Sequence, residues 1–485
     1  MTTIKKYNLP IYNYLREYAK KDLNIFHMPG HKLSLGIPQE LAKDILQLDV
    51  TEVDGTDNLH YPEGIIKEAQ ELAAKAFGAD RTFFLVNGST CGIQAAIMSV
   101  CTRGQKIIIG RDSHKAVVSG LIMSGAEPVF VYPEYNKEFG IHEGISVKSI
   151  ENALRANPDA AAVLITRPNY YGICSDIEAI ARAVHSHGKP LIVDEAHGAH
   201  LTFSPLLPPS SNRYGADICI QSAHKTLPAV TQGAYLHVNG SRVDIEKIKF
   251  NLAMLQTSSP SYIIMTYLDI ARELMQTEGR QRLEELIQNV TAFKSRITEN
   301  TGIRALSNTD LSINTIQDPT RLVLNIRGLG TDGFRADKIL REQMSTQVEM
   351  ADYENLVFIT TIADNRQTFM RLQEAMLRLS QLAYDNERSF KTDKLLEFAR
   401  CEKSVESTKG MNPYEAYAAP KEQMPLAASL GRVCAGIITP YPPGIPVLYP
   451  GEIIDDLKIK YIETIIDLGG KVNGIGNNIS VQVVK

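Results

Sequence analysis

The chain has 485 residues and a formal net charge of -4; hydrophobic residues make up 44% and charged residues 22% of it. This composition is typical of a soluble globular protein, and the length is enough for about two to four domains. The weakly negative net charge does not indicate a basic surface for binding nucleic acid or an anionic membrane. The sequence shows no stretch apolar enough to cross a bilayer and no signal-peptide pattern at its start.

The six cysteines are scattered and form no C-x-x-C pair. Several lie in apolar runs, where cysteine behaves as a small core residue. Such usage favours a reducing compartment, and we expect a cytoplasmic protein.

In chain order, residues 10–24 predict a short helix, and the segment 26–32 (FHMPGHK) predicts a turn that presents two histidines. An acidic loop follows at residues 49–60. Its four carboxylates suit either a cation or plain solvation, and composition does not separate the two.

Residues 65 to about 240 alternate between helical and β-branched stretches. Short continuous apolar runs separated by helices indicate a mainly parallel sheet covered on both faces. The predicted helices are 67–77, 92–100, 116–124, 147–156 and 177–187, and the predicted strands are 83–86, 106–109, 128–132, 161–166, 190–193, 218–220 and 234–238.

Such sheets bind ligands beyond the carboxyl ends of their strands, so the residues that follow each strand are the informative ones. Gly88, Ser89 and Thr90 follow the first strand and open a helix, an arrangement suited to a phosphate monoester. The pattern is neither a Walker A loop nor G-x-G-x-x-G. Polar residues also follow four later strands, giving one polar rim: His114, Asn169, Asp194 and Lys225.

Lys225 lies in the turn Gln221-Ser222-Ala223-His224-Lys225 after a short buried strand. A lysine that is partly removed from water loses its proton more easily, which makes Lys225 a candidate Schiff-base nucleophile. A single lysine at a strand end is more often solvent-exposed, so the argument depends on the rest of the rim.

Two chemistries fit this rim. Asp194, His197 and His200 could ligate a metal, but that site would leave Lys225 and the phosphate-shaped loop without a role. Pyridoxal 5'-phosphate uses all three features: an amine for its aldehyde, a loop for its phosphate and a buried acid such as Asp194 for its pyridine nitrogen. We therefore expect this cofactor and no metal.

Beyond the lysine turn, residues 256–262 form a polar loop, which either reaches a neighbouring subunit or caps a helix. A long amphipathic helix is predicted over 265–298, followed by a small α/β region with strands 322–326, 348–350 and 356–360 and helices 333–344 and 366–384. Asp352 and Glu354, between these strands, could face the cleft, but a solvated turn is the expected arrangement. The stretch 386–409 is expected to be a linker or exposed helix, and Gly474 with Gly476 a turn.

Taken together and in order, seven motifs closely resemble the bacterial ornithine/lysine/arginine decarboxylase class-I family. They are FHMPGHK (26–32), DNLH (57–60), NGST (87–90), His-Lys at 114–115, VDEAHGAH (193–200), SAHKT (222–226) and PYPPGIP (440–446). The resemblance implies an α/β protein of the fold-type-I, aspartate-aminotransferase-like class. Its expected parts are an N-terminal segment (1–64), a large cofactor-binding domain (65–298), a small α/β domain (299–390) and a linker with a C-terminal domain (391–485).

By this resemblance Lys225 forms the internal aldimine, Asp194 pairs with the pyridine N–H and His114 stacks on the ring. Ser89, Thr90 and Ser222 would hold the phosphate, and Ala196 and His224 would flank the cofactor. Gly88, His197 and Asn169 complete the candidate cofactor-binding set, although the family usually has threonine where this chain has Asn169, and Arg167 is also unusual. Lys225 and His224 are the candidates that protonate the substrate Cα.

The expected reaction is decarboxylation of a basic amino acid, arginine, lysine or ornithine, with a lean towards arginine and agmatine as product. A carboxylate-rich patch would bind the distal cation, and the candidates are Glu52, Asp54, Asp57 and His60. An aminotransferase or aldolase on the same fold is the alternative. We expect that the N-terminal wing domain of the larger relatives is absent here, and we therefore expect a homodimer or a dimer of dimers with shared active sites.

Overall fold

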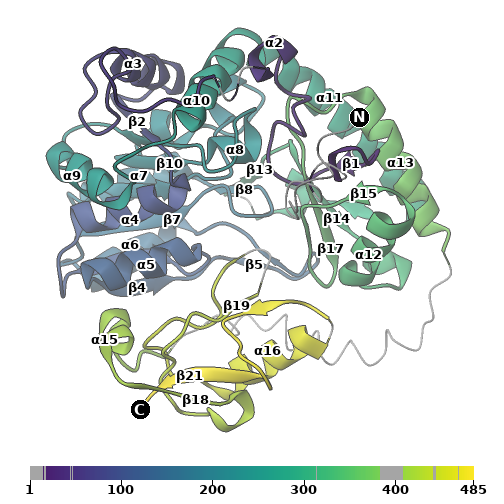
Figure 1. Ribbon diagram of the computed structural model, residues 1–485. Coiled ribbons are helices and arrows are strands. Elements are labelled where there is room, and N and C mark those ends of the chain that lie inside the picture. Colours follow the sequence, from purple (N-terminus) through teal and green to yellow (C-terminus); the bar gives the residue numbers. More distant parts are fainter. Residues whose placement is uncertain are drawn as a thin grey trace, which may run out of the picture.

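The computed structural model describes residues 15, 18–43, 45, 47–312, 314–382, 408–440, 444–467 and 469–485. A seven-stranded sheet lies at the centre of the larger lobe (Figure 1). Its order is β2 (Arg81–Leu85), β11 (Ala234–Val238), β10 (Ile218–Gln221), β9 (Leu191–Asp194), β7 (Ala162–Thr166), β3 (Lys106–Gly110) and β4 (Glu127–Val131).

Strand β11 runs antiparallel to its neighbours β10 and β2, and the remaining neighbours pair in parallel. Each predicted strand of this region is present within two residues of its expected bounds. The predicted mainly parallel sheet is therefore confirmed.

Helices cover both faces of this sheet. Successive side chains of a strand point to opposite faces, so a continuous apolar strand contributes to the core on each face. Ile107 and Ile109 of β3 join the core beneath three helices, whereas Ile108 joins the core beneath two others. The first group is α4 (Gly88–Val100), α5 (Lys115–Ser124) and α9 (Ile245–Leu255), and the second is α6 (Val147–Ala156) and α7 (Ile177–Ser186). Each fully buried isoleucine stabilises the fold by about 1.5–3 kcal/mol.

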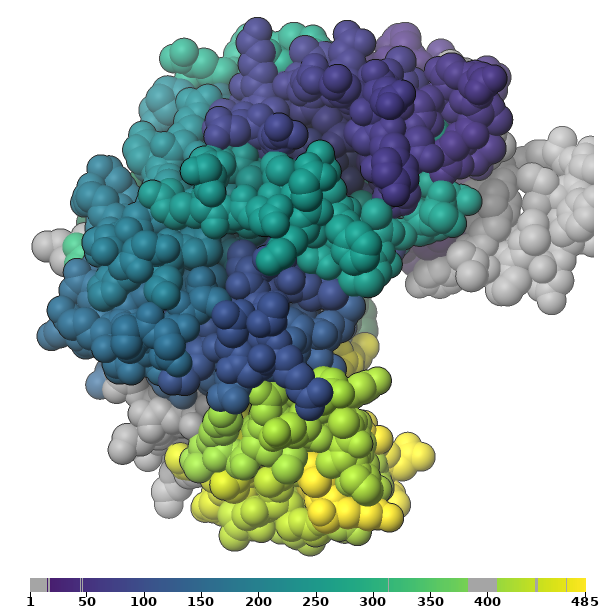
Figure 2. Space-filling model, turned by 90° about the vertical axis from the view of Figure 1, so that its left-hand side faces the viewer, coloured from purple at the N-terminus to yellow at the C-terminus, as the bar shows by residue number. Residues whose placement is uncertain are grey.

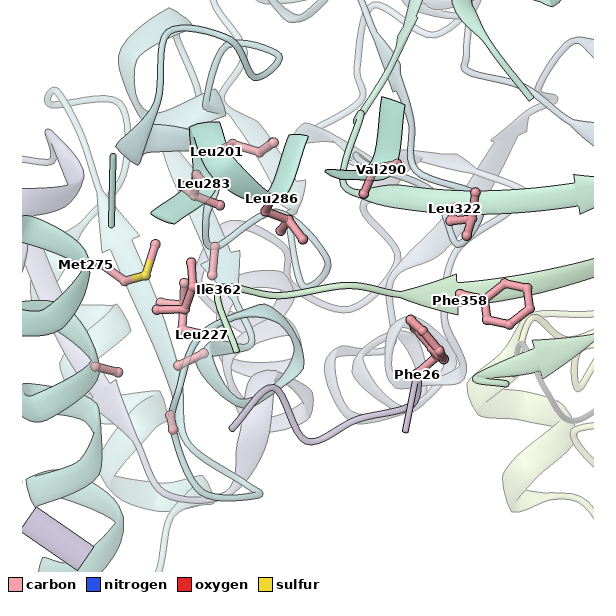
Figure 3. Close-up of a cluster of buried hydrophobic side chains, with 14 of the residues drawn as sticks. Phe26, Leu201, Leu227, Met275, Leu283, Leu286, Val290, Leu322, Phe358 and Ile362 are labelled. Atoms are coloured by element: carbon pink, nitrogen blue, oxygen red, sulfur yellow. The ribbon is translucent and has the colours of Figure 1, made fainter. Parts of the chain in front are cut away.

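The predicted long helix over 265–298 is interrupted. The chain forms α10 (Tyr262–Leu274), a π-helical turn (Met275–Gly279) and α11 (Arg280–Thr301). A π-turn inserts one extra residue and rotates the following helix. Leu283, Leu286 and Val290 of α11 then face the same core as Met275 (Figure 3).

A four-stranded sheet forms the smaller lobe, in the order β12 (Arg304–Ala305), β14 (Arg321–Asn325), β17 (Asn355–Ile359) and β16 (Met350–Ala351). Helices α11, α12 (Gly333–Gln343) and α13 (Arg366–Ser380) pack against this part. The predicted strand 348–350 is only partly present: residue 350 lies in β16, whereas residues 348 and 349 connect β16 to the short strand β15 (Thr346–Gln347). Strand β15 pairs with β1 (Asn24–Ile25), which ties the N-terminal segment to the smaller lobe.

Phe26, directly after β1, packs edge-on against Phe358 of β17 with ring centroids 5.3 Å apart (Figure 3). The larger lobe and its border contain further elements. They are α2 (Gln39–Ala42), α3 (Ile65–Phe77), α8 (Ala223–Thr226) and the strand pairs β5 (Tyr135–Asn136) with β6 (Ile141–His142) and β8 (Ile173–Ser175) with β13 (Thr315–Gln317).

The C-terminal residues form a separate lobe at the bottom of Figure 2, with its own small core. It contains α15 (Pro413–Ala418), α16 (Asp456–Asp467), the pair β18 (Lys421–Pro425) and β21 (Ser480–Val484), and the pair β19 (Thr439–Pro440) and β20 (Val472–Asn473). Gly474 lies in a turn with a positive φ of 88°, as expected.

Arg111, which follows β3, anchors this lobe to the large sheet. Its Nη1 donates to the Pro446 carbonyl at 2.6 Å and its Nη2 to the Val447 carbonyl at 2.9 Å. A buried ion pair with Glu452 at 3.3 Å and the Tyr449 ring beneath the guanidinium complete the contact. The C-terminal lobe thus lies directly beside the loop that carries His114.

Several expectations fall outside the described residues: residues 10–14, 16 and 17 of the helix expected at 10–24, most of the stretch 386–409, and Tyr441, Pro442 and Pro443. In the described part of the first, residues 15, 18 and 19 are helical, and the chain leaves the helix well before residue 24, where β1 begins. The division at residues 64, 298 and 390 stays a prediction. Across the described ranges, none of the helices combines the length and the apolar character that a bilayer span requires.

Candidate active site

The polar rim predicted from the strand ends is present. Asp194 is the last residue of β9, and Lys225 lies in the single helical turn α8 that follows β10. Because β9 and β10 are parallel neighbours, their carboxyl ends deliver the two side chains to the same edge of the sheet.

The Lys225 amine is close to neutral imidazole rather than to a carboxylate partner. Its Nζ lies 3.0 Å from Nε2 of His197. Burial lowers the pKa of Lys225 below its usual range; the negative charges of Asp194 and Glu349 oppose this effect, and Arg321 adds to it. Lowered proton affinity is what a lysine nucleophile requires.

Asp194 is almost completely buried, with 2% of its surface exposed. Its Oδ1 accepts a hydrogen bond from the Ala196 backbone N–H at 3.2 Å, and burial raises its pKa while Lys225 opposes the rise. A buried carboxylate with a single protein donor at Oδ1 is suited to a cationic N–H from a ligand.

The loop before α4 forms a cradle at the end of β2. Gly88 has a positive φ of 71° and donates its N–H to the Gln232 carbonyl at 2.9 Å. The hydroxyls of Ser89 and Ser222 lie 2.6 Å apart, although they follow different strands. Together with the N-terminus of α4 they suit a phosphate, and the neighbouring Thr90 is exposed.

His114 caps the N-terminus of α5, with Nδ1 accepting from the Ala116 N–H at 3.2 Å. Burial lowers the pKa of His114 to about 4, with further lowering by Lys225 and Lys115. The imidazole is therefore neutral at physiological pH. A neutral flat ring that lies close enough to be influenced by the Lys225 charge is compatible with stacking on an aromatic cofactor.

His224 is oriented by the backbone around it. Its Nδ1 lies 3.1 Å from the Gly233 carbonyl, so the ring proton is on Nδ1. Burial lowers its pKa to about 4. The His224 carbonyl accepts from the Gly30 N–H at 2.7 Å, which joins the FHMPGHK turn to the lysine turn.

These features together fit pyridoxal 5'-phosphate. An amine of low proton affinity, a buried acid and a two-hydroxyl cradle at a helix N-terminus occupy one rim. Each provides for a different part of that cofactor, namely the aldehyde, the ring nitrogen and the phosphate.

Asn169 and Arg167, the two unusual residues, support the loop after β7. The Asn169 amide donates to the carbonyls of His142 and Glu143, and its Oδ1 accepts from the N–H groups of Tyr171 and Ile173. These bonds engage both ends of the Asn169 side chain. Arg167 forms a buried ion pair with Glu195 at 3.3 Å.

The acidic loop makes different contacts from those of the rim. Asp57 accepts hydrogen bonds from the backbone N–H groups of residues 58, 63, 64, 66 and 67, and so caps the start of α3. Asp54 is exposed, and Glu52 accepts a short hydrogen bond from Thr51. His60 lies 2.8 Å from the Thr257 carbonyl. The role of these four residues in substrate binding stays a prediction.

The polar loop 256–262 provides a helix cap. Ser261 accepts from the Ile264 N–H at 3.4 Å at the start of α10. Gln256 turns inward, and its Oε1 accepts from the Val86 N–H at 2.8 Å, next to the phosphate cradle.

The three residues weighed as metal ligands have separate partners. His200 is engaged by Asp318 at 2.9 Å and by the Thr320 hydroxyl at 3.0 Å. His197 instead faces Lys225. Within the ranges that the structure describes, no group of three metal-ligating side chains was found.

The expected solvated turn at Asp352 and Glu354 is wrong. Asp352 accepts from the Tyr171 hydroxyl at 2.9 Å and from the N–H groups of Glu354 and Asn355, and Glu354 is only 4% exposed. Burial raises the pKa of Asp352 to about 6. The turn is buried because the loop after β7 packs onto it.

The sequence reasoning missed Arg321, Tyr170 and Glu349. Arg321 begins β14 and its Nη2 lies 3.2 Å from Nδ1 of His197. Tyr170 packs edge-on against the His197 ring with centroids 4.8 Å apart, and its hydroxyl donates to Glu349. The only sequence signal for Arg321 was its position as a charged residue directly before the predicted strand 322–326, and charged residues at such positions are common.

Comparison with known proteins agrees with this site. Residues 9–316 match the family model described as the major domain of Orn/Lys/Arg decarboxylases, and residues 398–482 match the model of their C-terminal domain. An arginine decarboxylase of Bacillus subtilis is 36% identical over 477 residues, covering 97% of this chain and 96% of that protein.

Solved structures show the same fold. Lysine decarboxylase A from Pseudomonas aeruginosa superimposes with a TM-score of 0.80 at 21% identity, covering 98% of this chain and 80% of that one. An alanine–glyoxylate aminotransferase from Nostoc gives a TM-score of 0.60 at 15% identity, covering 78% of this chain and 99% of that one. The fold is thus that of the fold-type-I pyridoxal-phosphate enzymes, and since the family models and the full-length relative agree, this chain belongs to the Orn/Lys/Arg decarboxylase family.

Proposed function

We propose that this protein removes the α-carboxylate of arginine, giving agmatine and CO2, with Lys225 holding the pyridoxal-phosphate cofactor. The observation that carries the proposal is the Lys225 amine of low proton affinity beside buried Asp194, on a chain of a decarboxylase family. Arginine is favoured among the basic amino acids because a relative that is 36% identical over 97% of this chain is named an arginine decarboxylase, whereas a lysine decarboxylase of Escherichia coli with the same coverage of this chain is 24% identical.

Each rim residue has a defined task in this proposal. Ser89, Thr90 and Ser222 would hold the phosphate, Asp194 would accept the ring N–H, and His114 and Ala196 would flank the cofactor. When bound, the cofactor supplies an electron sink for the electron pair that the departing carboxylate leaves behind. By keeping its charge beside the ring nitrogen, Asp194 maintains the protonation on which that sink depends.

A proton must then reach the substrate Cα, and Lys225 is the better of the two candidates. His224 carries its ring proton on Nδ1, which is engaged by the Gly233 carbonyl, and its pKa is about 4. Its Nε2 therefore holds no proton to donate at neutral pH. A proton taken up transiently by the free Lys225 amine, in contrast, is destabilised there by burial and is given up readily.

We further propose that the enzyme is a cytoplasmic homodimer, or a dimer of dimers, with shared active sites. Large apolar side chains are exposed around the acidic loop and on α9, including Val53 at 57%, Tyr61 at 77% and Phe250 at 70%. Tyr61 and Phe250 also line an open hollow of about 1120 Å³. A second copy that covers this face would bring its acidic loop, with Glu52 and Asp54, towards a substrate cation.

The test of the reaction is CO2 release from purified protein supplied with pyridoxal phosphate and with arginine, lysine or ornithine in turn. Agmatine, identified by mass, is the expected product. Cadaverine or putrescine alone would move the specificity to lysine or ornithine. Release from none of the three, with the cofactor bound, would overturn the proposal and favour an aminotransferase, tested by adding an amino acceptor.

The test of the assembly is light scattering on the holoenzyme, with Phe250→Glu as the disrupting variant and the exposed Lys148→Glu on α6 as its control. We expect at least a dimer for the wild type and dissociation for Phe250→Glu alone. A monomeric, fully active wild type would contradict the shared-site proposal.

A further inference from the structure

Arg321 reaches the cofactor rim from the smaller lobe and is almost completely buried, with 1% of its surface exposed. Its approach depends on Gly172, because a Cβ there would lie 2.4 Å from Cβ of Arg321, and Gly172 has a positive φ of 81°. The Asp318 N–H also donates to the Gly172 carbonyl at 2.7 Å. The two lobes therefore meet where Arg321 enters.

His197 lies between Arg321 and Lys225. Nη2 of Arg321 is 3.2 Å from Nδ1 of His197, and Nε2 of His197 is 3.0 Å from Nζ of Lys225. The Tyr170 ring packs edge-on against the His197 imidazole, with ring centroids 4.8 Å apart, and further restrains it. His197 as a whole is 6% exposed, so water has little access to the residue.

The chemistry of the donors fixes the proton on this imidazole. A guanidinium has only N–H donors, so Nδ1 of His197 must accept and a neutral ring must carry its proton on Nε2. That N–H points at Lys225. A lysine nitrogen can accept a hydrogen bond only as the free amine, because an ammonium has no lone pair.

We propose that Arg321 is a positioning residue that, by fixing the tautomer of His197, holds the Lys225 amine in its unprotonated form. This inference rests on the proposed role of Lys225 as the residue that holds the cofactor. The free amine is the only form that can attack an aldehyde, so Arg321 would act on the reaction without contacting the reacting atoms.

The other charged and titratable groups around the pair do not remove this effect. Asp194 on β9 and Glu349 beside β15 favour the ammonium form of Lys225. Burial is the first cause that lowers the pKa of His197 well below its usual range, and Lys225, Arg321, His114 and His224 lower it further. His197 thus stays neutral, which the tautomer argument requires.

The first experiment follows the full-length chain, depleted of cofactor, as it takes up pyridoxal phosphate at a series of pH values. The visible absorbance gained on attachment to Lys225 gives the rate, and the midpoint of the pH profile reports the amine. In Arg321→Met, His197 can place its proton on Nδ1 and accept from the Lys225 ammonium. We expect the midpoint to rise by about one to two pH units, whereas Arg321→Lys, which keeps a donor cation, should stay closer to wild type.

A control separates this relay from the direct effect of the Arg321 charge on Lys225. In a His197→Phe background the Arg321→Met substitution should change the midpoint little, since the connecting imidazole is gone. An unchanged midpoint in Arg321→Met, or an equal rise in both backgrounds, would overturn the inference. Loss of attachment in the wild type as well would instead contradict the proposed function.

A second measurement needs no folded variant of Arg321. In the wild-type chain labelled with ¹⁵N-histidine, the His197 signals, assigned by their loss in His197→Phe, should show a protonated Nε2 and an unprotonated Nδ1. The reverse pattern would exclude the relay.

Discussion

The rim at Lys225 and the acidic loop at residues 49–60 both gather ionisable side chains, but they treat them in opposite ways. At the rim, Asp194 is buried with a raised pKa and His114 is neutral with a pKa of about 4. In the acidic loop, backbone N–H groups around Asp57 lower its pKa although partial burial acts to raise it, and Asp54 is exposed.

The two regions differ in how far their ionisable groups are buried and in how many hydrogen-bond donors the protein gives them. Burial penalises charge at the rim, and too few protein donors are present to offset that cost, so the groups are prepared to exchange protons or to bind a charged ligand. The loop instead satisfies its Asp57 with five backbone donors. A cluster of charges in a sequence therefore locates chemistry only when its burial is also known.

The largest effect is expected from Lys225→Ala at the rim. The variant should lose the visible absorbance of the attached cofactor and at least about a thousandfold in CO2 release, since no other rim group replaces the nucleophile. Lys148→Ala, at an exposed position of α6, is the matched control and should behave as wild type. Full absorbance in Lys225→Ala would assign the cofactor to another residue.

Gly30→Ala tests how firmly the N-terminal turn fixes the rim. A Cβ at residue 30 would lie 2.6 Å from the Leu227 carbonyl oxygen, while the Gly30 N–H supports the His224 carbonyl. We expect the free energy of unfolding to fall by up to about 3 kcal/mol, with weaker cofactor retention. Urea titration measures the free energy of unfolding, and dialysis measures cofactor retention. Gly436→Ala, where only Gln482 lies nearby at 3.9 Å, should change neither.

Much of the large sheet could be predicted from sequence. Continuous apolar runs such as residues 107–109 are buried on both faces, and parallel strands place the residues after them at one edge. Lys225, Asp194 and His114 were found for that reason. Arg321 was not, because its contact with His197 joins residues 124 positions apart and leaves no local pattern.

The misjudged turn at Asp352 has the same kind of cause. Two acids between short strands indicate a solvated turn, and only the packing of Tyr171 onto them reverses that environment. The π-helical turn between α10 and α11 was also missed. The apolar spacing from Leu283 onward is regular, so it predicts the helix but not the point at which its apolar face is rotated.

Asp352→Asn sharpens the comparison between buried and solvated acids. Its folded pKa of about 6 lies above the unfolded value, so the contribution of Asp352 to stability is greatest below about pH 4 and declines as the pH rises through 6. Relative to wild type, Asp352→Asn should gain about 1–2 kcal/mol between pH 4 and pH 7. Urea midpoints across that range measure it, and parallel curves for the two proteins would contradict the burial of this acid.

Within the acidic loop, Asp57 and Asp54 should separate stability from substrate binding. Asp57→Ala removes the cap of α3 and should cost about 1 kcal/mol in the free energy of unfolding. Because the folded pKa of Asp57 is lowered, this contribution is present above about pH 4 and is lost as the pH falls through the folded value. Asp54→Ala should leave stability within about 0.5 kcal/mol and instead raise KM for arginine. Urea titration and steady-state kinetics on both variants decide it: an unaltered KM in Asp54→Ala would remove that carboxylate from the proposed substrate contact and leave the loop a structural element organised by Asp57.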